Sequence, residues 1–210
     1  LIIEGLKKGG FESTVISKVK DLIYGKEYNY RRRISLHVDE NQNVGFYERS
    51  TNKIVNIDRC LISSERINII IDLINKNKNL IPKIALNISI EEGDSEIGML
   101  INVRDNSFSE ELKIWEKIFD SQNISGELKT EKETKYIWGS KVLKFNYPFL
   151  EKGYLEVPIG SFSQVNSEVN SKLVESVLNY ADKISAKKVE DLYAGAGNFA
   201  IGLANKGIYV

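Results

Sequence analysis

The sequence has very little cysteine and histidine. Its 210 residues include one cysteine, Cys60, and one histidine, His37. One thiol cannot form an intramolecular disulfide, and one residue of each type is too few for a zinc site. A chain without internal disulfides suits a reducing compartment, so we expect a cytoplasmic protein.

The sequence also lacks long apolar runs and a net charge. No run approaches the roughly 20 apolar residues that a transmembrane helix needs, and the first residues do not form a signal peptide. Basic and acidic side chains number 29 each, so the overall charge indicates no polyanionic partner. Residues 1–80 carry 14 basic against 10 acidic side chains, whereas residues 81–135 carry 7 against 12. A surface that binds a polyanion would therefore lie in the first part, although an ordinary solvated surface shows similar imbalances.

Alternating apolar residues predict a first part built mainly of strands. Residues 34–38 alternate as a half-buried strand does, and residues 84–90 and 97–103 form an expected hairpin around an acidic turn. Further expected strands are 44–47, 135–138, 141–145 and 154–157, of which the middle two form a hairpin around Gly139, and expected helices are 1–9, 64–78 and 108–119. We therefore expect an α+β central domain with an antiparallel sheet over residues 1–155.

A helix, a strand and a glycine turn are expected in the last part. Residues 166–181 have an apolar residue at every fourth position, and Asn166 is a suitable N-cap for that helix. Residues 189–193 form an expected buried strand, after which a turn leads into a helix that ends near Gly207. We expect residues 156–210 to be the first β-α-β part of a Rossmann-like α/β domain. Because the chain does not begin with methionine and stops within this unit, we expect it to be cut at both ends.

The turn after the expected strand contains Gly195 and Gly197. Glycine lets the backbone approach a ligand closely, and the following helix offers free N–H groups and a positive dipole end. This arrangement predicts a nucleotide-type cofactor, with the Asp191 carboxylate near a ligand ammonium or hydroxyl group. A dinucleotide remains possible because Ala200 is a tolerated third position of G-x-G-x-x-G, whereas the Gly-Lys-Ser/Thr of a phosphate loop is absent. S-adenosylmethionine and a plain tight turn are the other interpretations.

Two segments together resemble a known family. The chain has SFSQVN at residues 161–166, then the expected helix, then DLYAGAGNF at residues 191–199. This order and spacing resemble the RNA uridine methyltransferases that make 5-methyluridine in tRNA and large-subunit rRNA. Those enzymes have Phe-Phe-Gln-Val-Asn and then Asp-Leu-Tyr/Phe-Cys-Gly-x-Gly-Asn/Thr-Phe, so this chain departs from them at Ser163 and Ala194. YRRR at residues 30–33 and the segment 45–60 also resemble the family, and so does the hairpin that follows.

The resemblance implies a cofactor, a partner and contact residues. The implied cofactor is S-adenosylmethionine, and the implied partner is structured RNA, either rRNA or tRNA. We expect the protein to be a monomer and to have no membrane partner. The turn and the resemblance together give as cofactor-binding residues Gln164, Asp191, Tyr193, Gly195, Gly197 and Asn198. A loop residue that caps a helix is the alternative for Gln164, a core aromatic for Tyr193, and a helix N-cap for Asn198.

Arg31, Arg32 and Arg33 are the expected RNA-binding residues, because arginines contact phosphates. Alternation places Arg32 on the opposite side of the strand from the other two, so all three cannot bind one RNA backbone. A solvated run of charge is the alternative interpretation.

Cys60 matches a position that supplies the last of four cluster thiolates in the iron–sulfur members of the family. The other three, in a Cys-x5-Cys-x2-Cys pattern, are absent from this sequence, and a lone thiolate cannot hold a [4Fe–4S] cluster. We therefore expect Cys60 to be a free thiol and any cluster to belong to the full-length parent. A small buried residue in a protein without a cluster is the alternative.

The resemblance implies that the parent protein methylates carbon 5 of a uridine in rRNA or tRNA. In the family, a cysteine thiolate attacks carbon 6 of the uracil ring and a carboxylate base later removes a proton. Both residues are expected beyond residue 210, so this chain is assigned no catalytic residue and is expected to be inactive alone. Two other functions stay open: a non-catalytic RNA-binding fragment or degenerate paralogue, and a small-molecule methyltransferase.

Overall fold

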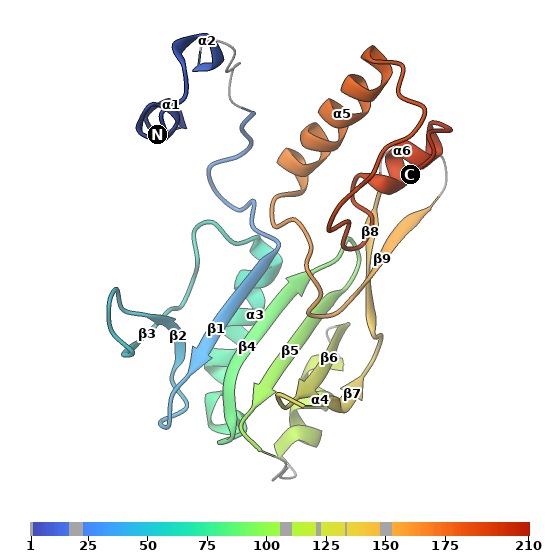
Figure 1. Cartoon of the computed structure of the whole chain (residues 1–210). Coiled ribbons are helices and arrows are strands. Elements are labelled where there is room, and N and C mark those ends of the chain that lie inside the picture. Colours follow the sequence, from blue (N-terminus) through green and yellow to red (C-terminus); the bar gives the residue numbers. More distant parts are fainter. Residues whose placement is uncertain (1, 17–22, 106–110, 121–122, 133, 148–152) are drawn as a thin grey trace.

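The computed structural model describes the chain except for residues 1, 17–22, 106–110, 121–122, 133 and 148–152. Its described strands form a large mixed sheet and a small one (Figure 1). In spatial order the large sheet contains β3 (Ile54–Asn56), β2 (Val44–Tyr47), β1 (Arg33–Val38), β4 (Ala85–Glu92), β5 (Ile97–Val103), β6 (Ile124–Lys129) and β7 (Thr134–Trp138). The small sheet contains β8 (Val142–Asn146) and β9 (Tyr154–Pro158).

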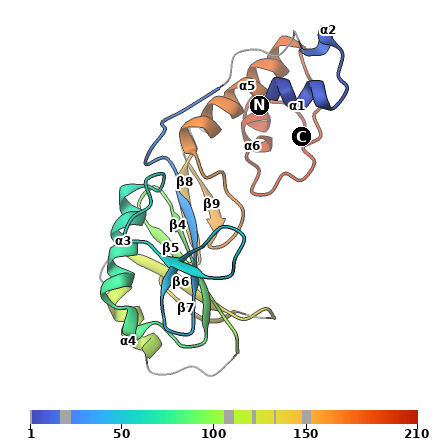
Figure 2. The same ribbon diagram turned by 90° about the vertical axis from the view of Figure 1, so that its left-hand side faces the viewer.

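The helices form two groups in space. Figure 2 shows α3 (Glu65–Lys76) and α4 (Glu111–Asp120) on the same side of the large sheet, with the short helix η1 (Lys78–Leu80) after α3. The second group contains α1 (Ile2–Lys8), α2 (Ser13–Ile16), α5 (Ser167–Lys183) and α6 (Ala200–Asn205). It lies beyond the end of the large sheet where β1 begins and β4 ends (Figure 1). None of the helices in the described part of the chain is long and apolar enough to cross a membrane.

One face of the large sheet is apolar and packs against the helices. Alternate residues of the central strands point to this face, and Leu36, Ile88 and Ile101 on it are completely buried. The buried residues Ile67 and Ile74 of α3 recur at helical spacing, so that helix presents an apolar stripe to the sheet. The predicted strands at 34–38, 44–47, 84–90 and 97–103 are therefore confirmed within two residues at each end, as is the predicted helix at 64–78.

The opposite face of the sheet carries small polar side chains. Ser89 Oγ donates to Ser35 Oγ at 3.1 Å, and Asn102 Nδ2 donates to Asn87 Oδ1 at 2.7 Å. These hydrogen bonds link neighbouring strands, so the polar half of the alternation also stabilises the sheet.

The expected antiparallel sheet is wrong at one pair of strands. β5 and β6 run parallel, with Met99 opposite Gly126, whereas the other described pairs of the large sheet are antiparallel. Parallel neighbours need a long crossover connection, and α4 provides it between these two strands. The sequence analysis predicted α4 but did not predict β6, so the crossover was missed.

The expected hairpin around Gly139 is also wrong. β7 pairs with β6, and β8 pairs with β9, so the two strands on either side of Gly139 belong to different sheets. Trp138 lies over Gly126, where an added Cβ would stand only 2.0 Å from its ring, and Trp138 Nε1 donates to the carbonyl of Ile124 at 3.0 Å. This close packing fixes β7 on β6, and Gly139 then turns the chain away with φ of 68°.

The last part of the chain has a separate, smaller core. It is formed by Tyr147, Val174, Leu178, Ala181, Leu203 and Ile208, mostly from α5 and α6. Asn166 Oδ1 accepts a hydrogen bond from Val169 N at 3.0 Å, so the predicted N-cap of α5 is confirmed. The position of the domain boundary near residue 155 stays a prediction.

The expected strand at residues 189–193 is wrong. Lys188 forms one isolated parallel bridge with Tyr209, supported by a hydrogen bond of 2.8 Å from Val189 N to Tyr209 O. A strand is defined by a ladder of such bonds, and no other described segment pairs with residues 189–193. The glycine turn and the helix after it are present, since α6 begins at Ala200.

Candidate functional site

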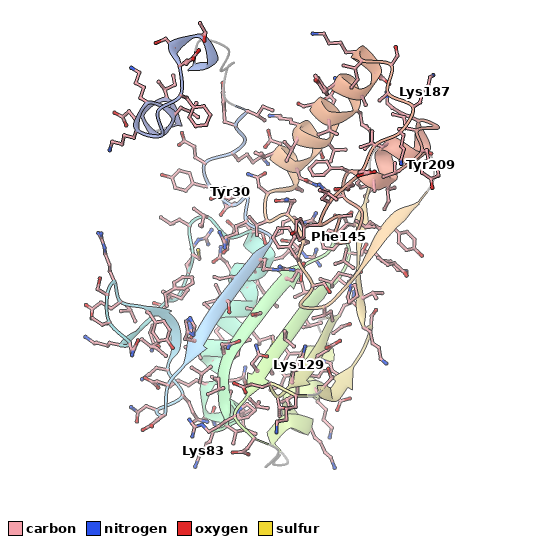
Figure 3. The ribbon with its side chains drawn as sticks, viewed as in Figure 1. Tyr30, Lys83, Lys129, Phe145, Lys187 and Tyr209 are labelled. Atoms are coloured by element: carbon pink, nitrogen blue, oxygen red, sulfur yellow. The ribbon has the colours of Figure 1, made fainter. Side chains whose placement is uncertain are left out.

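A pocket of about 190 Å³ lies where the small sheet, α5 and the glycine turn meet. Its apolar wall is formed by Phe145, Leu155, Val157 and Val174. Figure 3 shows Phe145 in the region where the strands of the large sheet end below α5. Polar side chains from the first turns of α5 line another part of the pocket, so the site combines an apolar surface with a few hydrogen-bonding groups, as ligand pockets usually do.

The pocket gathers most of the residues that the sequence analysis assigned to a cofactor. Gln164, Asp191, Tyr193, Gly195 and Asn198 line it, from two segments on either side of α5. Gly197 is not among the lining residues, although both of its neighbours in sequence are. The structure thus places these residues together, and their role as cofactor contacts stays a prediction.

The backbone of the turn has the left-handed conformation at three nearby residues. Gly195 and Gly197 have φ of 59° and 85°, which glycine adopts without strain. Tyr193 has φ of 61°, an unfavourable conformation for a residue with a large side chain. Its side chain is also fully exposed, which contradicts the alternative interpretation as a core aromatic. Tyr193 therefore lies at the edge of the pocket without packing that explains its conformation.

Asp191 caps the helix that follows the turn. Its Oδ2 atom accepts a hydrogen bond of 3.2 Å from Ala200 N, the first residue of α6. A carboxylate at this position also interacts favourably with the positive end of the helix. The alternative interpretation of Asn198 as the N-cap is wrong, because its side chain is used elsewhere.

The side chain of Asn198 joins the turn to α5. Its Nδ2 donates to Asn170 Oδ1 at 2.9 Å, and Asn170 Nδ2 donates to Asn198 Oδ1 at 2.8 Å. This reciprocal amide pair spans 28 residues of sequence. It therefore fixes the turn relative to the helix that forms the neighbouring side of the pocket.

Tyr147 is a residue of the site that the sequence analysis missed. Its buried hydroxyl donates a hydrogen bond to the backbone carbonyl of Asn198. Burial raises the pKa of Tyr147 above its ordinary value, and the nearby negative charge of Asp191 raises that pKa further. The phenol therefore stays protonated and able to donate. No motif includes Tyr147, which follows β8 directly and packs in the core formed with α5 and α6.

Arg32, one of the expected RNA-binding residues, lines this pocket instead of standing free. Its guanidinium pairs with Asp94 Oδ1 at 2.5 Å and lies 5.2 Å from the centroid of the Phe145 ring. The cation thus connects the residue before β1 to the apolar wall of the pocket.

The other two arginines also have partners within the chain. Arg33 Nη2 lies 2.6 Å from Glu91 Oε1, whose side chain is only 4% exposed. Arg31 Nε donates to the carbonyl of Arg33 at 2.8 Å. RNA binding by the three arginines stays a prediction, and these contacts would compete with it.

Cys60 packs against the sheet core and does not line the pocket. The residue is half-buried, with its backbone N donating to Asn68 Oδ1 at 2.8 Å and its carbonyl accepting from Asn68 Nδ2 at 3.1 Å. Within the described ranges no group of three or more His, Cys, Asp or Glu side chains could hold a metal ion. Cys60 is therefore not in position to react with a ligand in the pocket.

In comparisons with known proteins, the chain is similar to RNA uracil-5-methyltransferases. The sequence model of a family described as tRNA (uracil-5-)-methyltransferase matches residues 13–209. The 23S rRNA (uracil(1939)-C(5))-methyltransferase RlmD of Haemophilus parainfluenzae is 26% identical over 195 residues, covering 88% of this chain and 43% of that protein. RlmD of Shewanella amazonensis is 28% identical over 201 residues, with 90% and 44% covered. The chain thus spans less than half the length of these curated relatives.

A solved structure has the same fold. The crystal structure of Pyrococcus abyssi tRNA (uracil-54, C5)-methyltransferase in complex with S-adenosyl-L-homocysteine superposes with a TM-score of 0.72. The superposition covers 98% of this chain and 52% of that one, at 21% sequence identity. At that identity the likeness establishes the arrangement of the mixed sheet and helices, and no more.

Proposed function

We propose, from the premise that this chain belongs to the tRNA (uracil-5-)-methyltransferase family, that its full-length protein methylates carbon 5 of a uridine in RNA. The observation that carries the proposal is the pocket in which Gln164 meets the turn containing Gly195. The relatives named above act on 23S rRNA, and the solved structure belongs to a tRNA enzyme, so the substrate is either rRNA or tRNA. The protein is proposed to act as a monomer in the cytoplasm.

The pocket residues suit the binding of S-adenosylmethionine, which supplies the methyl group when bound. Gly195 lets the ligand approach the backbone, and the side-chain amide of Gln164 offers both a donor and an acceptor for the methionine end. The apolar wall that includes Phe145 and Val157 is suited to the adenine ring. Asn198 and Asp191 contribute mainly by holding the turn, since one pairs with α5 and the other caps α6.

The reaction also needs a thiolate and a base near the uracil ring, and neither role is assigned here. Cys60 is packed against the sheet core rather than the pocket. We propose that both groups, and any [4Fe–4S] cluster ligands besides Cys60, lie outside these 210 residues. The chain alone is then catalytically inactive, and its pocket is smaller than the roughly 300–1,000 Å³ of complete ligand sites, so it binds the cofactor weakly.

Methyl transfer by the full-length protein tests the proposal. The protein is incubated with S-adenosylmethionine labelled in its methyl group and with unmodified rRNA or tRNA, and the digested nucleosides are analysed by mass spectrometry. Labelled 5-methyluridine is expected, and Gln164→Ala is expected to lower its yield about tenfold or more, as loss of a hydrogen bond to a charged ligand group would. Ser176→Ala, on the side of α5 away from the pocket, is the matched control and is expected to retain activity.

Two outcomes contradict the proposal. Absence of 5-methyluridine from both RNAs would favour a non-catalytic RNA-binding protein. Transfer of the labelled methyl group only to a small molecule would favour a small-molecule methyltransferase. Full activity of Gln164→Ala would leave the methylation but remove this pocket from it.

A further inference from the structure

A carboxylate is buried on the polar face of the large sheet, outside the pocket. Glu91 stands in register between Arg33 of β1 and Gly98 of β5, and its side chain is only 4% exposed. Burial of a charged group is unfavourable unless the group is paired and hydrogen-bonded. The partners of Glu91 therefore show what the residue holds in place.

One partner lies on β1, and the other lies in the segment that leads into α5. Glu91 Oε1 pairs with Arg33 Nη2 at 2.6 Å and also accepts a hydrogen bond from Ser163 Oγ. Arg33 Nη2 in turn donates to the carbonyl of Ser161. We call this set the Glu91 clamp: Glu91, Arg33, Ser163 and the Ser161 carbonyl. It holds the chain on both sides of Phe162.

The start of the same segment packs tightly on the sheet. A Cβ added to Gly98 would stand 2.9 Å from Ile159, so that strand approaches the segment as closely as glycine allows. Gly160 turns the chain with φ of 80°, and an added Cβ there would stand 2.7 Å from Leu100. The segment is therefore seated on β5 immediately before the clamp.

Ser163 and the residues on either side of it line the pocket. Phe162 and Gln164 are both pocket residues, and both side chains are exposed, with Phe162 at 70%. The Ser163 hydroxyl is held by Glu91 of the sheet, whereas the exposed side chains of Phe162 and Gln164 have little packing of their own to fix them.

We propose that Glu91 is a positioning residue, which acts through Ser163 to hold Phe162 and Gln164 at the pocket. The inference rests on the proposed function, since it assigns these two side chains to cofactor or substrate binding. Ser163 stands where the resembled family segment has a second phenylalanine, so the hydroxyl that makes this contact is a departure of this chain from the family pattern.

A purely stabilising role explains Glu91 less well. Its Oε2 atom is buried and has no hydrogen-bond partner within the described part of the chain. An unpaired buried acceptor is destabilising, and a well-packed apolar side chain at this position would avoid that cost. The carboxylate is better explained by a positioning role, in which it accepts a hydrogen bond from Ser163 and pairs with Arg33 in one fixed geometry.

The test measures cofactor affinity in the full-length protein by calorimetry with S-adenosylhomocysteine. Ser163→Ala and Glu91→Leu each remove the hydrogen bond between the two side chains and are each expected to weaken binding about fivefold to tenfold, the size of one net hydrogen bond. Because both act through one contact, the double variant is expected to bind no more weakly than about the worse single variant. Ser163→Thr keeps the hydroxyl and is expected to restore binding. Ser161→Ala is the control, since only its backbone carbonyl belongs to the clamp.

Hydrogen exchange separates positioning from folding. Ser163→Ala is expected to speed amide exchange in residues 159–165 and to leave residues 97–103 of β5 unchanged, with an unchanged melting temperature. Wild-type affinity in Ser163→Ala and Glu91→Leu, beside clear weakening in Gln164→Ala, would overturn the positioning role alone. A wild-type protein that does not bind S-adenosylhomocysteine would overturn the proposed function, and this inference with it.

Discussion

The sheet core and the pocket region of this protein are built in opposite ways. In the sheet, alternate residues such as Ile88, Met99 and Ile101 are completely buried, and periodicity alone explains their positions. In the turn that borders the pocket, Leu192 and Tyr193 are 76% and 102% exposed, and Tyr193 has a left-handed backbone. The first region is shaped by the packing of its own side chains. The second keeps apolar and strained residues at a surface, which is typical of sites that bind something.

The largest expected effect is the loss of stability when a buried side chain of the sheet core is truncated. A similar truncation at the turn is expected to have little effect. Ile101→Ala is expected to lower the free energy of unfolding by about 2–5 kcal/mol, because it leaves a cavity among buried residues. Leu192→Ala, a similar truncation of an exposed side chain, is expected to change it by less than about 0.5 kcal/mol. Urea unfolding followed by circular dichroism measures both. Equal losses would show that the turn is packed as firmly as the sheet.

A smaller effect of opposite sign is expected at Tyr193. Tyr193→Gly relieves a left-handed backbone without removing buried surface, so it is expected to raise the free energy of unfolding by about 1 kcal/mol. In the full-length protein the same variant is expected to weaken S-adenosylhomocysteine binding, since the side chain lines the pocket. Destabilisation of the chain by this variant would mean that the tyrosine is held by contacts and is not strained.

The raised pKa of Tyr147 makes the stability of the protein depend on pH at alkaline values. Its folded-state pKa is raised above the ordinary 10.0, so the folded protein holds this proton more tightly than the unfolded chain does. The resulting contribution to stability is fully present below pH 10 and is lost as the pH rises through the folded-state pKa. We expect the melting temperature of the wild type to fall more steeply than that of Tyr147→Phe as the pH rises above about 10. Parallel profiles would show that the phenol titrates normally.

The smallest effect is expected for RNA binding by Arg31. Its guanidinium is already held by the carbonyl of Arg33, so Arg31→Ala is expected to flatten the salt dependence of RNA binding by less than about one phosphate equivalent. Filter binding of the chain to structured RNA at several salt concentrations measures the slope, with the exposed Arg49→Ala as the control. Flattening by one to two equivalents would establish Arg31 as a phosphate contact despite its intramolecular bond.

The sequence could predict elements whose cause is local. Alternation identified β1, β4 and β5, fourfold spacing with Asn166 identified α5, and the two glycines identified the turn. Features that depend on distant partners could not be predicted. β6 contains Gly126, which is favourable in a strand only because Trp138 covers it, so its local sequence does not mark it as a strand.

The candidate site divides in the same way. The motif residues Gln164 and Gly195 were found from sequence, and the structure places them in one pocket. The contacts that hold the pocket together were not found, because the bond from Tyr147 to Asn198 and the bond from Ser163 to Glu91 span 51 and 72 residues of sequence. Each of those pairs exists only once the two sheets and the helices are in place.

The reciprocal amide pair between Asn170 and Asn198 has a consequence for how the pocket responds to its medium. These two neutral amides attach the glycine turn to α5. Neither amide gains or loses a proton over the usual pH range. On the side of the sheet, the attachment depends on ion pairs made by Arg32 and Arg33 with Asp94 and Glu91. Added salt weakens the more exposed of these pairs and leaves the amides untouched. Ionic strength would therefore loosen one wall of the pocket while the other keeps its shape.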